Sequence, residues 1–140
     1  MATKKITRGV CRLLADMGYS VLREFKLISG RRVDVAGLDR KGHFIVVEVK
    51  SSLADFRCDE KWPEYLPFCD TFYFAVGSEF PIGVLPEDQG LIVADGFSGV
   101  IRRPSEPLSM NGQRRKTQIL RFARKAAARL ESHLDSMQRT

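Results

Sequence analysis

The chain has 140 residues, of which 44% are hydrophobic, and a formal net charge of +6. This length suits a single domain over residues 1–140, and no apolar run approaches the roughly 18 residues that cross a membrane. The first residues are basic but no apolar h-region follows them, so we expect no secretory signal and a soluble, cytoplasmic protein.

The first third of the chain predicts one helix followed by three strands. Apolar residues recur at three- and four-residue steps over residues 4–17, which is typical of a helix, and Gly18 is a natural stop. Period-two patterns then predict strands over residues 19–28, 32–38 and 43–50. The polar DRKG turn between the last two predicts that they pair as a hairpin.

The rest of the chain predicts a helix, a strand, a short hairpin and a long terminal helix. Ser52 can cap a helix that Pro63 limits or kinks. Residues 71–76 predict a fourth strand, and a helical crossover before it would make it parallel to the third. Residues 91–94 and 100–103 predict a small hairpin, and residues 113 to about 137 a helix. We therefore expect an α/β fold with a mixed four-stranded sheet flanked by helices, a β-hairpin extension and a C-terminal helix.

Two carboxylates and a lysine fall on the predicted hairpin. Pairing the strands about the DRKG turn puts Asp34 opposite residues 47–49, so Glu48 is its expected cross-strand neighbour. Glu48 and Lys50 are two residues apart on one strand and therefore share a face. A lone strand aspartate or a Glu-x-Lys ion pair is common in proteins, but the three residues together are a more specific pattern.

Carboxylates that face each other repel unless a cation lies between them. Asp34, Glu48, the backbone carbonyl of Val49 and waters would form an oxygen ligand set that suits Mg²⁺. Lys50 could then orient or deprotonate a water, or stabilise negative charge on a phosphate. The pattern predicts metal-assisted phosphodiester hydrolysis.

The segment RRVDVAGLDRKGHFIVVEVKSS resembles the core motif of the PD-(D/E)xK, or restriction-endonuclease-like, nuclease superfamily, whose core has the order αβββαβ. RRVDV, EVKSS, DEKWPEYLPFCDTFYFAV and GLIVAD are more narrowly similar to the MmcB-like DNA repair family, over residues 7 to 103. The resemblance implies that Asp34 and Glu48 bind Mg²⁺, with Mn²⁺ as a substitute, and that Lys50 is the catalytic lysine. Val33 stands where the motif has proline.

Other residues are expected near these three. The candidate supporting residues are Glu24, Ser51, Lys61 and Tyr65, and the candidate phosphate contacts at the hairpin are Arg31 and Arg32. Glu24 could be an outer metal ligand or a solvent-facing strand residue. Ser51 could donate a hydrogen bond to a phosphate, and Lys61 and Tyr65, four residues apart, could face one groove.

The positive charge is concentrated in the last forty residues. Residues 101–140 contain ten Lys or Arg and three Asp or Glu, a balance of +7, so the first hundred residues have a balance of −1. A helical wheel of the terminal helix places on one face Ile119, Ala123, Ala126, Leu130, Leu134 and Met137, and opposite them Arg114, Arg121, Arg124 and Lys125. The apolar face is expected to dock on the domain or on a second subunit, and the basic face could follow a DNA backbone or be merely solvated.

These observations predict a DNA repair-associated, Mg²⁺-dependent endonuclease that hydrolyses DNA. The alternative is a non-catalytic DNA- or partner-binding module that retains the nuclease fold, and a third hypothesis is a homodimeric interaction protein. So short a chain leaves little room for a separate specificity domain. A homodimer, or recruitment by another DNA repair protein, could therefore supply selectivity.

Overall fold

The computed structural model describes residues 2–139 of the chain. The elements in chain order are α1 (Ala2–Asp16), β1 (Ser20–Lys26), β2 (Arg32–Leu38), β3 (Phe44–Val49), α2 (Leu53–Cys58), the 3₁₀ helix η1 (Trp62–Phe68), β4 (Thr71–Val76), the 3₁₀ helix η2 (Ile82–Val84), β5 (Gly90–Ala94), β6 (Gly99–Arg103) and α3 (Gly112–Met137). Within the described residues, none of the helices combines the length and apolarity needed to span a bilayer.

The strands form a single mixed sheet in the order β1-β2-β3-β4-β5-β6. β1, β2 and β3 are antiparallel neighbours, β3, β4 and β5 are parallel, and β6 returns antiparallel to β5. The predicted β2–β3 hairpin and the parallel crossover to β4 are confirmed.

The prediction of a four-stranded sheet with a separate hairpin was wrong. β5 pairs with β4 from Tyr73↔Gly90 to Val76↔Val93, so the β5–β6 hairpin continues the sheet to six strands. Gly90 permits this close approach, because a Cβ there would lie 2.6 Å from the carbonyl oxygen of Phe72. Local periodicity identifies a short hairpin, but the neighbour of its first strand depends on packing across the intervening loop.

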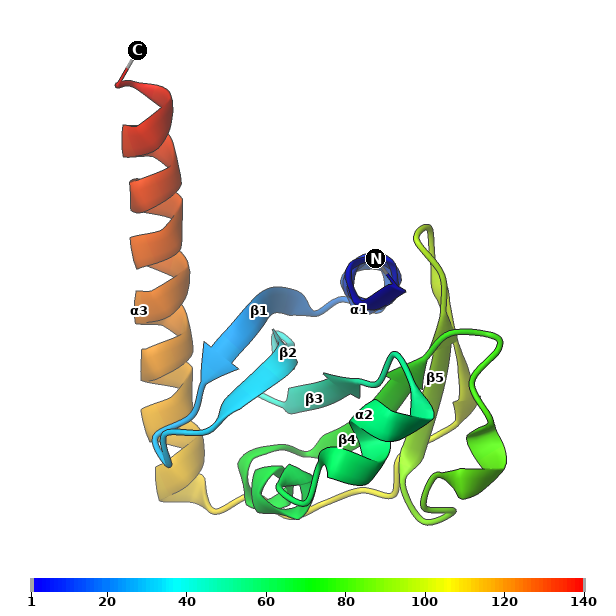
Figure 1. Cartoon of the computed structure of the whole chain (residues 1–140). Coiled ribbons are helices and arrows are strands. Elements are labelled where there is room, and N and C mark those ends of the chain that lie inside the picture. Colours follow the sequence, from blue (N-terminus) through cyan, green and yellow to red (C-terminus); the bar gives the residue numbers. More distant parts are fainter. Residues whose placement is uncertain (1, 140) are drawn as a thin grey trace.

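Helices cover both faces of the sheet (Figure 1). α1 lies on one face, where Val10 and Leu14 pack with Val35, Ile45 and Val47. α2, η1 and the first half of α3 cover the other face, whose aromatic core contains Phe25, Phe44, Phe68, Phe72, Phe74 and Phe122. Because both faces are covered, all six residues of β3 are buried, including Glu48. A buried carboxylate in the middle of the sheet therefore needs a specific explanation.

Strand β1 departs from strict alternation at Glu24. Leu22 and Phe25 lie in the same core although they are three residues apart. Glu24 adopts a φ of 50°, a left-handed conformation that is uncommon for a residue other than glycine, and this rotates the rest of the strand. The period-two pattern predicted for this strand, which would put Leu22 and Phe25 on opposite faces, is therefore wrong at this point.

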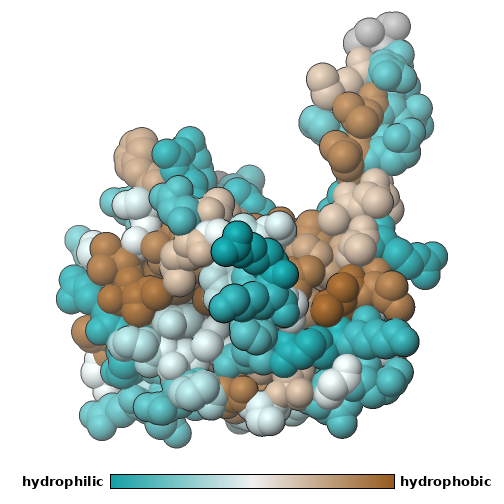
Figure 2. All heavy atoms as spheres, turned by 180° about the vertical axis from the view of Figure 1, so that it is seen from behind, coloured by the Kyte–Doolittle hydropathy of each residue, from teal (hydrophilic) through white to brown (hydrophobic). Residues whose placement is uncertain are grey.

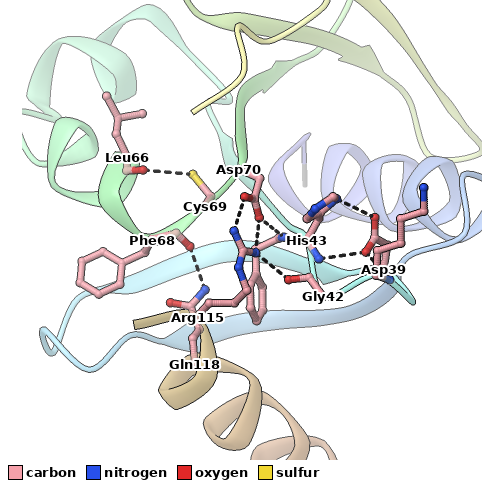
Figure 3. Close-up of polar contacts among 11 residues, drawn as sticks. Asp39, Gly42, His43, Leu66, Phe68, Cys69, Asp70, Arg115 and Gln118 are labelled. Atoms are coloured by element: carbon pink, nitrogen blue, oxygen red, sulfur yellow. Dashed lines mark hydrogen bonds and ion pairs between the residues drawn. The ribbon is translucent and has the colours of Figure 1, made fainter. Parts of the chain in front are cut away.

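Helix α3 is anchored at its first half and stands clear of the body at its second half (Figures 1 and 2). Arg115 forms a two-point ion pair with Asp70, with N···O distances of 2.6 and 2.8 Å, and also donates to the carbonyl of Gly42. Gln118 donates to the carbonyl of Phe68 at 2.8 Å (Figure 3). These polar contacts tie α3 to the loops before β3 and β4.

Only part of the predicted apolar face of α3 docks on the domain, and docking of the rest on a second subunit stays a prediction. Ile119 and Ala126 pack against the domain, but the main anchor is Phe122, whose ring contacts Phe25 and Phe44 edge-on at 5.5 and 5.9 Å. The remaining members of the predicted face are exposed, namely Ala123, Leu130, Leu134 and Met137. A helical wheel gives the angle of each residue around the axis, whereas docking also depends on how far along the axis the domain reaches.

Candidate functional site

Asp34 and Glu48 meet where β2 and β3 separate. The register runs from Leu38↔Phe44 to Val35↔Val47 and then stops, and its continuation would place Asp34 opposite Glu48, as predicted. At this point hydrogen bonds from backbone N–H groups to side-chain carboxylates replace those between the two backbones. Glu48 Oε1 accepts a hydrogen bond from the backbone N–H of Asp34 at 2.9 Å, and Asp34 Oδ2 accepts one from the N–H of Val49 at 2.8 Å.

Lys50 lies on the same face and forms a buried ion pair. Its Nζ is 2.6 Å from Oδ2 of Asp59, and the two side chains are only 6% and 12% exposed. Asp59 immediately follows α2, and its Oδ1 also accepts from the N–H of Lys61. Sequence reasoning gave Asp59 no role, because it lies nine residues beyond Lys50 and after a helix. No fixed spacing signals that pair.

Burial and nearby negative charges raise the pKa values of the two carboxyls. Burial, followed by the negative charge of Asp34, raises the pKa of Glu48 to about 8. Burial also raises the pKa of Asp34. Burial acts in the same direction on Asp59, but hydrogen bonds from Lys50 and from the N–H of Lys61 outweigh it and hold the pKa of Asp59 below its usual value. Asp34, which is half-buried, and Glu48, which is buried, thus form an acidic pair in the kind of environment that shifts pKa values at functional sites.

The donor atoms of this pair fit a hard divalent cation. Each carboxylate uses one oxygen in a backbone hydrogen bond, and the other oxygen, Asp34 Oδ1 or Glu48 Oε2, has no hydrogen-bond donor among residues 2–139. Two carboxylates completed by waters are a common Mg²⁺ ligand set. The same part of the chain contains no group of three or more His, Cys, Asp or Glu that could hold a metal, so further ligands would be waters and backbone oxygen.

A basic groove opens beside Asp34. Its cavity of about 510 Å³ is lined by Thr3, Lys4, Thr7, Arg8, Arg23, Glu24 and Asp34. Glu24 therefore shares a surface with Asp34, as a supporting residue should, although its own role stays a prediction. Sequence reasoning missed Lys4 and Arg8, which lie one helical turn apart on the exposed side of α1. That four-residue spacing was visible in the sequence, but nothing local indicated that α1 passes over Asp34.

Ser51, Lys61 and Tyr65 differ in their relation to the acidic pair. Ser51 is exposed, and its N–H donates to Asp55, while Ser52 caps α2 as expected. Tyr65 is buried, and burial followed by the charge of Glu48 raises its pKa to about 12. Lys61 is exposed and directly precedes a 3₁₀ helix, in which residues four apart do not share a face, so the expectation that it faces one groove with Tyr65 does not follow from their spacing.

The candidate phosphate contacts are partly engaged with the protein. Arg31 pairs with Glu64 at 3.1 Å, whereas Arg32 is exposed. On α3, Arg114 covers the ring of Phe68 at 4.9 Å, and Arg121 donates to the carbonyl of Lys26. Both arginines are half-buried, so they do not lie fully on a solvent face as the helical wheel indicated.

Arg124 and Lys125 remain exposed on α3. With Arg121, they line a shallow cavity of about 320 Å³ between α3 and the end of β1. A cluster of exposed cations against a sheet edge can bind phosphate groups. Their predicted contact with DNA stays a prediction.

Comparison with known proteins identifies the family. The sequence profile described as DNA repair protein MmcB-like matches residues 2–137. No curated protein matches the chain significantly. Among solved structures, the SPO1766 protein of unknown function from Silicibacter pomeroyi is 40% identical and superposes with a TM-score of 0.94, covering 100% of this chain and 96% of that one. The predicted family is confirmed, and the chain belongs to the MmcB-like DNA repair protein family.

Proposed function

We propose that this protein is a Mg²⁺-dependent DNA endonuclease of the PD-(D/E)xK type that acts in DNA repair. The observation that carries the proposal is the contact of Asp34 with Glu48 at the point where β2 and β3 separate, with Lys50 on the same face. The order α1-β1-β2-β3-α2-β4 agrees with the αβββαβ core implied by the resemblance, and the family description supplies the link to DNA repair.

Asp34 and Glu48 would hold the metal, with the carbonyl of Val49 as the proposed third protein ligand. Burial raises the pKa of both carboxyls, and the negative charge of Asp34 raises that of Glu48 further, so placing two negative charges here carries a penalty. A divalent cation would remove that penalty, and Mn²⁺ could substitute for Mg²⁺ because both accept oxygen ligands. When bound, such an ion lowers the pKa of a water and stabilises charge on a phosphoryl oxygen.

Lys50 would contribute a fixed positive charge. An ammonium group has three N–H donors, and Asp59 accepts one of them, which holds the side chain in place. The remaining donors could bind a non-bridging phosphate oxygen as negative charge develops there. In the hydrolysis, the oxygen of water forms a bond to phosphorus, the bond from phosphorus to the sugar oxygen breaks, and that oxygen takes up a proton.

Lys4, Arg8 and Arg23 would bind the DNA backbone next to the scissile phosphate. They line the same groove as Asp34, and Lys4, Arg8 and Arg23 are exposed. Each neutralised phosphate makes binding more sensitive to salt. DNA binding should therefore weaken steeply as the salt concentration rises.

Cleavage of a panel of single-stranded, flapped, abasic and mismatched DNAs tests the proposal. Mg²⁺ should support cleavage, EDTA should abolish it, and Asp34→Asn or Lys50→Met should lower the rate at least about 100-fold. Asp16→Asn, at the exposed end of α1, is the matched control and should retain full activity. Circular dichroism of each variant verifies folding. An absence of cleavage, or cleavage that survives Asp34→Asn, would refute the catalytic role.

Metal binding provides a second readout that does not depend on finding the substrate. Mg²⁺ at millimolar concentration should raise the thermal midpoint of the wild-type protein and of Asp16→Asn, but not that of Asp34→Asn. Equal responses of all three proteins would contradict the proposed ligands.

One observation favours the non-catalytic alternative. Lys50 is 5% exposed and already satisfied by Asp59, an arrangement that could equally stabilise a fold without chemistry. In that case DNA would bind in a salt-dependent manner without cleavage, binding would be unaffected by EDTA, and it would be lost when Arg124 and Lys125 are neutralised.

A further inference from the structure

Helix α3 carries an apolar stripe that no other element of residues 2–139 covers. Leu120, Leu130, Leu134 and Met137 are 57%, 59%, 43% and 63% exposed. With the exposed Ala123 and Ala127 they form a continuous line, which we call the α3 seam. Figure 2 shows apolar side chains on the part of the helix that stands clear of the body.

The seam follows a heptad pattern. Its members, at positions 120, 123, 127, 130, 134 and 137, are separated alternately by three and four residues, as are the a and d positions of a coiled coil. None of the six is charged, although charged residues occur throughout the same segment. The seam lies roughly 100° around the helix from the face that holds Phe122, at ~100° per residue. It is therefore distinct from the face that docks on the domain.

The distal half of α3 receives little support from its own domain. All residues from 130 to 139 are exposed, and they form no hydrogen bond or ion pair with the body of the protein within the described part of the chain. Short helices without tertiary packing are only marginally stable in water. A partner packed on the seam, which is about 25 Å long at 1.5 Å per residue, would supply the missing burial.

We propose that the α3 seam binds the same seam of a second copy of this chain, with the two helices antiparallel. In that arrangement an a residue faces a d residue. Leu120 then lies opposite Met137, Ala123 opposite Leu134, and Ala127 opposite Leu130. Each alanine meets a leucine, so large and small side chains alternate across the interface and the helices can approach closely.

The charges beside the seam favour the same orientation. Arg124 and Glu131 occupy equivalent heptad positions next to the seam, seven residues apart. In the antiparallel register, Arg124 faces Glu131 of the second copy, and the two-fold axis repeats that ion pair. In a parallel pair these two residues would instead face Ile119 and Ala126, which cannot form ion pairs. The antiparallel homodimer is thus the occupant that fits both the shape and the charge of the stripe.

This inference does not depend on the proposed nuclease activity. It does change the expectation for Arg124, which would contribute to the dimer interface, while Arg121 and Lys125 lie outside it. Two domains held by antiparallel helices would present two acidic pairs to one substrate.

Sedimentation equilibrium of the full chain, in reducing buffer at micromolar to hundreds of micromolar concentration, tests the dimer. The wild-type protein should reach twice the monomer mass of 15.8 kDa. Leu130→Glu should weaken association at least about 100-fold, because it buries a charge at the centre of the seam. Ser132→Glu, on the opposite side of the helix, is the matched control and should leave the mass unchanged. A wild-type monomer at all concentrations, or a dimer that survives Leu130→Glu, would overturn the proposal.

A charge swap tests the orientation. Arg124→Glu and Glu131→Arg should each weaken association about tenfold through like-charge repulsion, and the double variant should restore it. Both residues are exposed, so circular dichroism should show that the fold is retained. Failure of the double variant to restore the dimer would overturn the antiparallel register. If the chain stays monomeric and its α3 seam binds a helix of a different protein, the homodimer proposal itself would be overturned.

Discussion

The substitution Asp59→Asn should test the buried ion pair that holds Lys50. The amide keeps the shape of the carboxylate, and its Oδ1 can still accept from the N–H of Lys61, as Asp59 does at 2.8 Å. The charge opposite Lys50 is lost, and so is the oxygen that accepts from it, because the amide places an NH2 group there. That contact measures 2.6 Å between side chains that are 6% and 12% exposed. Breaking a buried ion pair costs about 3–5 kcal/mol. Because Asp59 retains some contact with water, we expect a loss of about 3 kcal/mol in the free energy of unfolding.

Urea unfolding at pH 7 in EDTA measures this loss. The matched control is Asp135→Asn, which removes the acid of a surface ion pair. The side chains of Arg139 and Asp135 in that pair are 78% and 56% exposed, so the variant should lose less than about 0.5 kcal/mol in the free energy of unfolding. The double variant Lys50→Met with Asp59→Asn should cost less than the sum of the two single changes, since it leaves no unpaired buried charge. If Asp59→Asn costs no more than the control, the ion pair does not hold Lys50.

Three further changes test the site and the fold in the metal-free protein. Raising the pH from 5 to 8 should lower the free energy of unfolding by roughly 3 kcal/mol, at 1.36 kcal/mol per pKa unit. Burial raises the pKa of folded Glu48 to about 8, so the folded protein keeps a proton that the unfolded chain loses above the ordinary pKa of 4.5. This loss of stability should be absent below pH 4.5, and urea titrations should show that Glu48→Gln removes it. An equal decline in the variant would contradict the assignment of the pH dependence to Glu48. Phe122→Ala should lower the free energy of unfolding in urea by about 3–5 kcal/mol. Phe97→Ala, at a residue that is 73% exposed, should lower it hardly at all, and equal losses would exclude Phe122 as the anchor of α3. Gly9→Ala should lower the thermal midpoint strongly, because its Cβ would lie 2.0 Å from a carbonyl oxygen of the β5–β6 turn. Gly112→Ala, with open space around it, should leave the midpoint unchanged. An unchanged midpoint for Gly9→Ala would contradict the close packing of α1 on that turn.

Most elements of the fold could be predicted from the sequence because their signals are local. Strands β2 and β4 begin and end where the apolar patterns do, and the short turn before β3 fixes the hairpin register. Asp34 and Glu48 are fourteen residues apart across that turn, so their proximity followed from counting. The superfamily resemblance rested on the same segment, whereas the narrower MmcB-like resemblance rested also on DEKWPEYLPFCDTFYFAV and GLIVAD.

The tertiary structure decided what local patterns cannot encode. The pairing of β5 with β4, the partnership of Lys50 with Asp59, and the passage of Lys4 and Arg8 over Asp34 all join segments separated by helices or long loops. Such contacts depend on how whole elements pack rather than on the period of any one of them.

Helix α3 illustrates both sides of this division. The sequence by itself determined that residues 113 to about 137 are helical, with an apolar face opposite basic side chains and the positive charge of the chain concentrated in the same region. Only the tertiary structure decided that Phe122 docks while Leu130 and Leu134 remain exposed, because the sheet is shorter than the helix that crosses its end. A side chain is buried only where another surface reaches it.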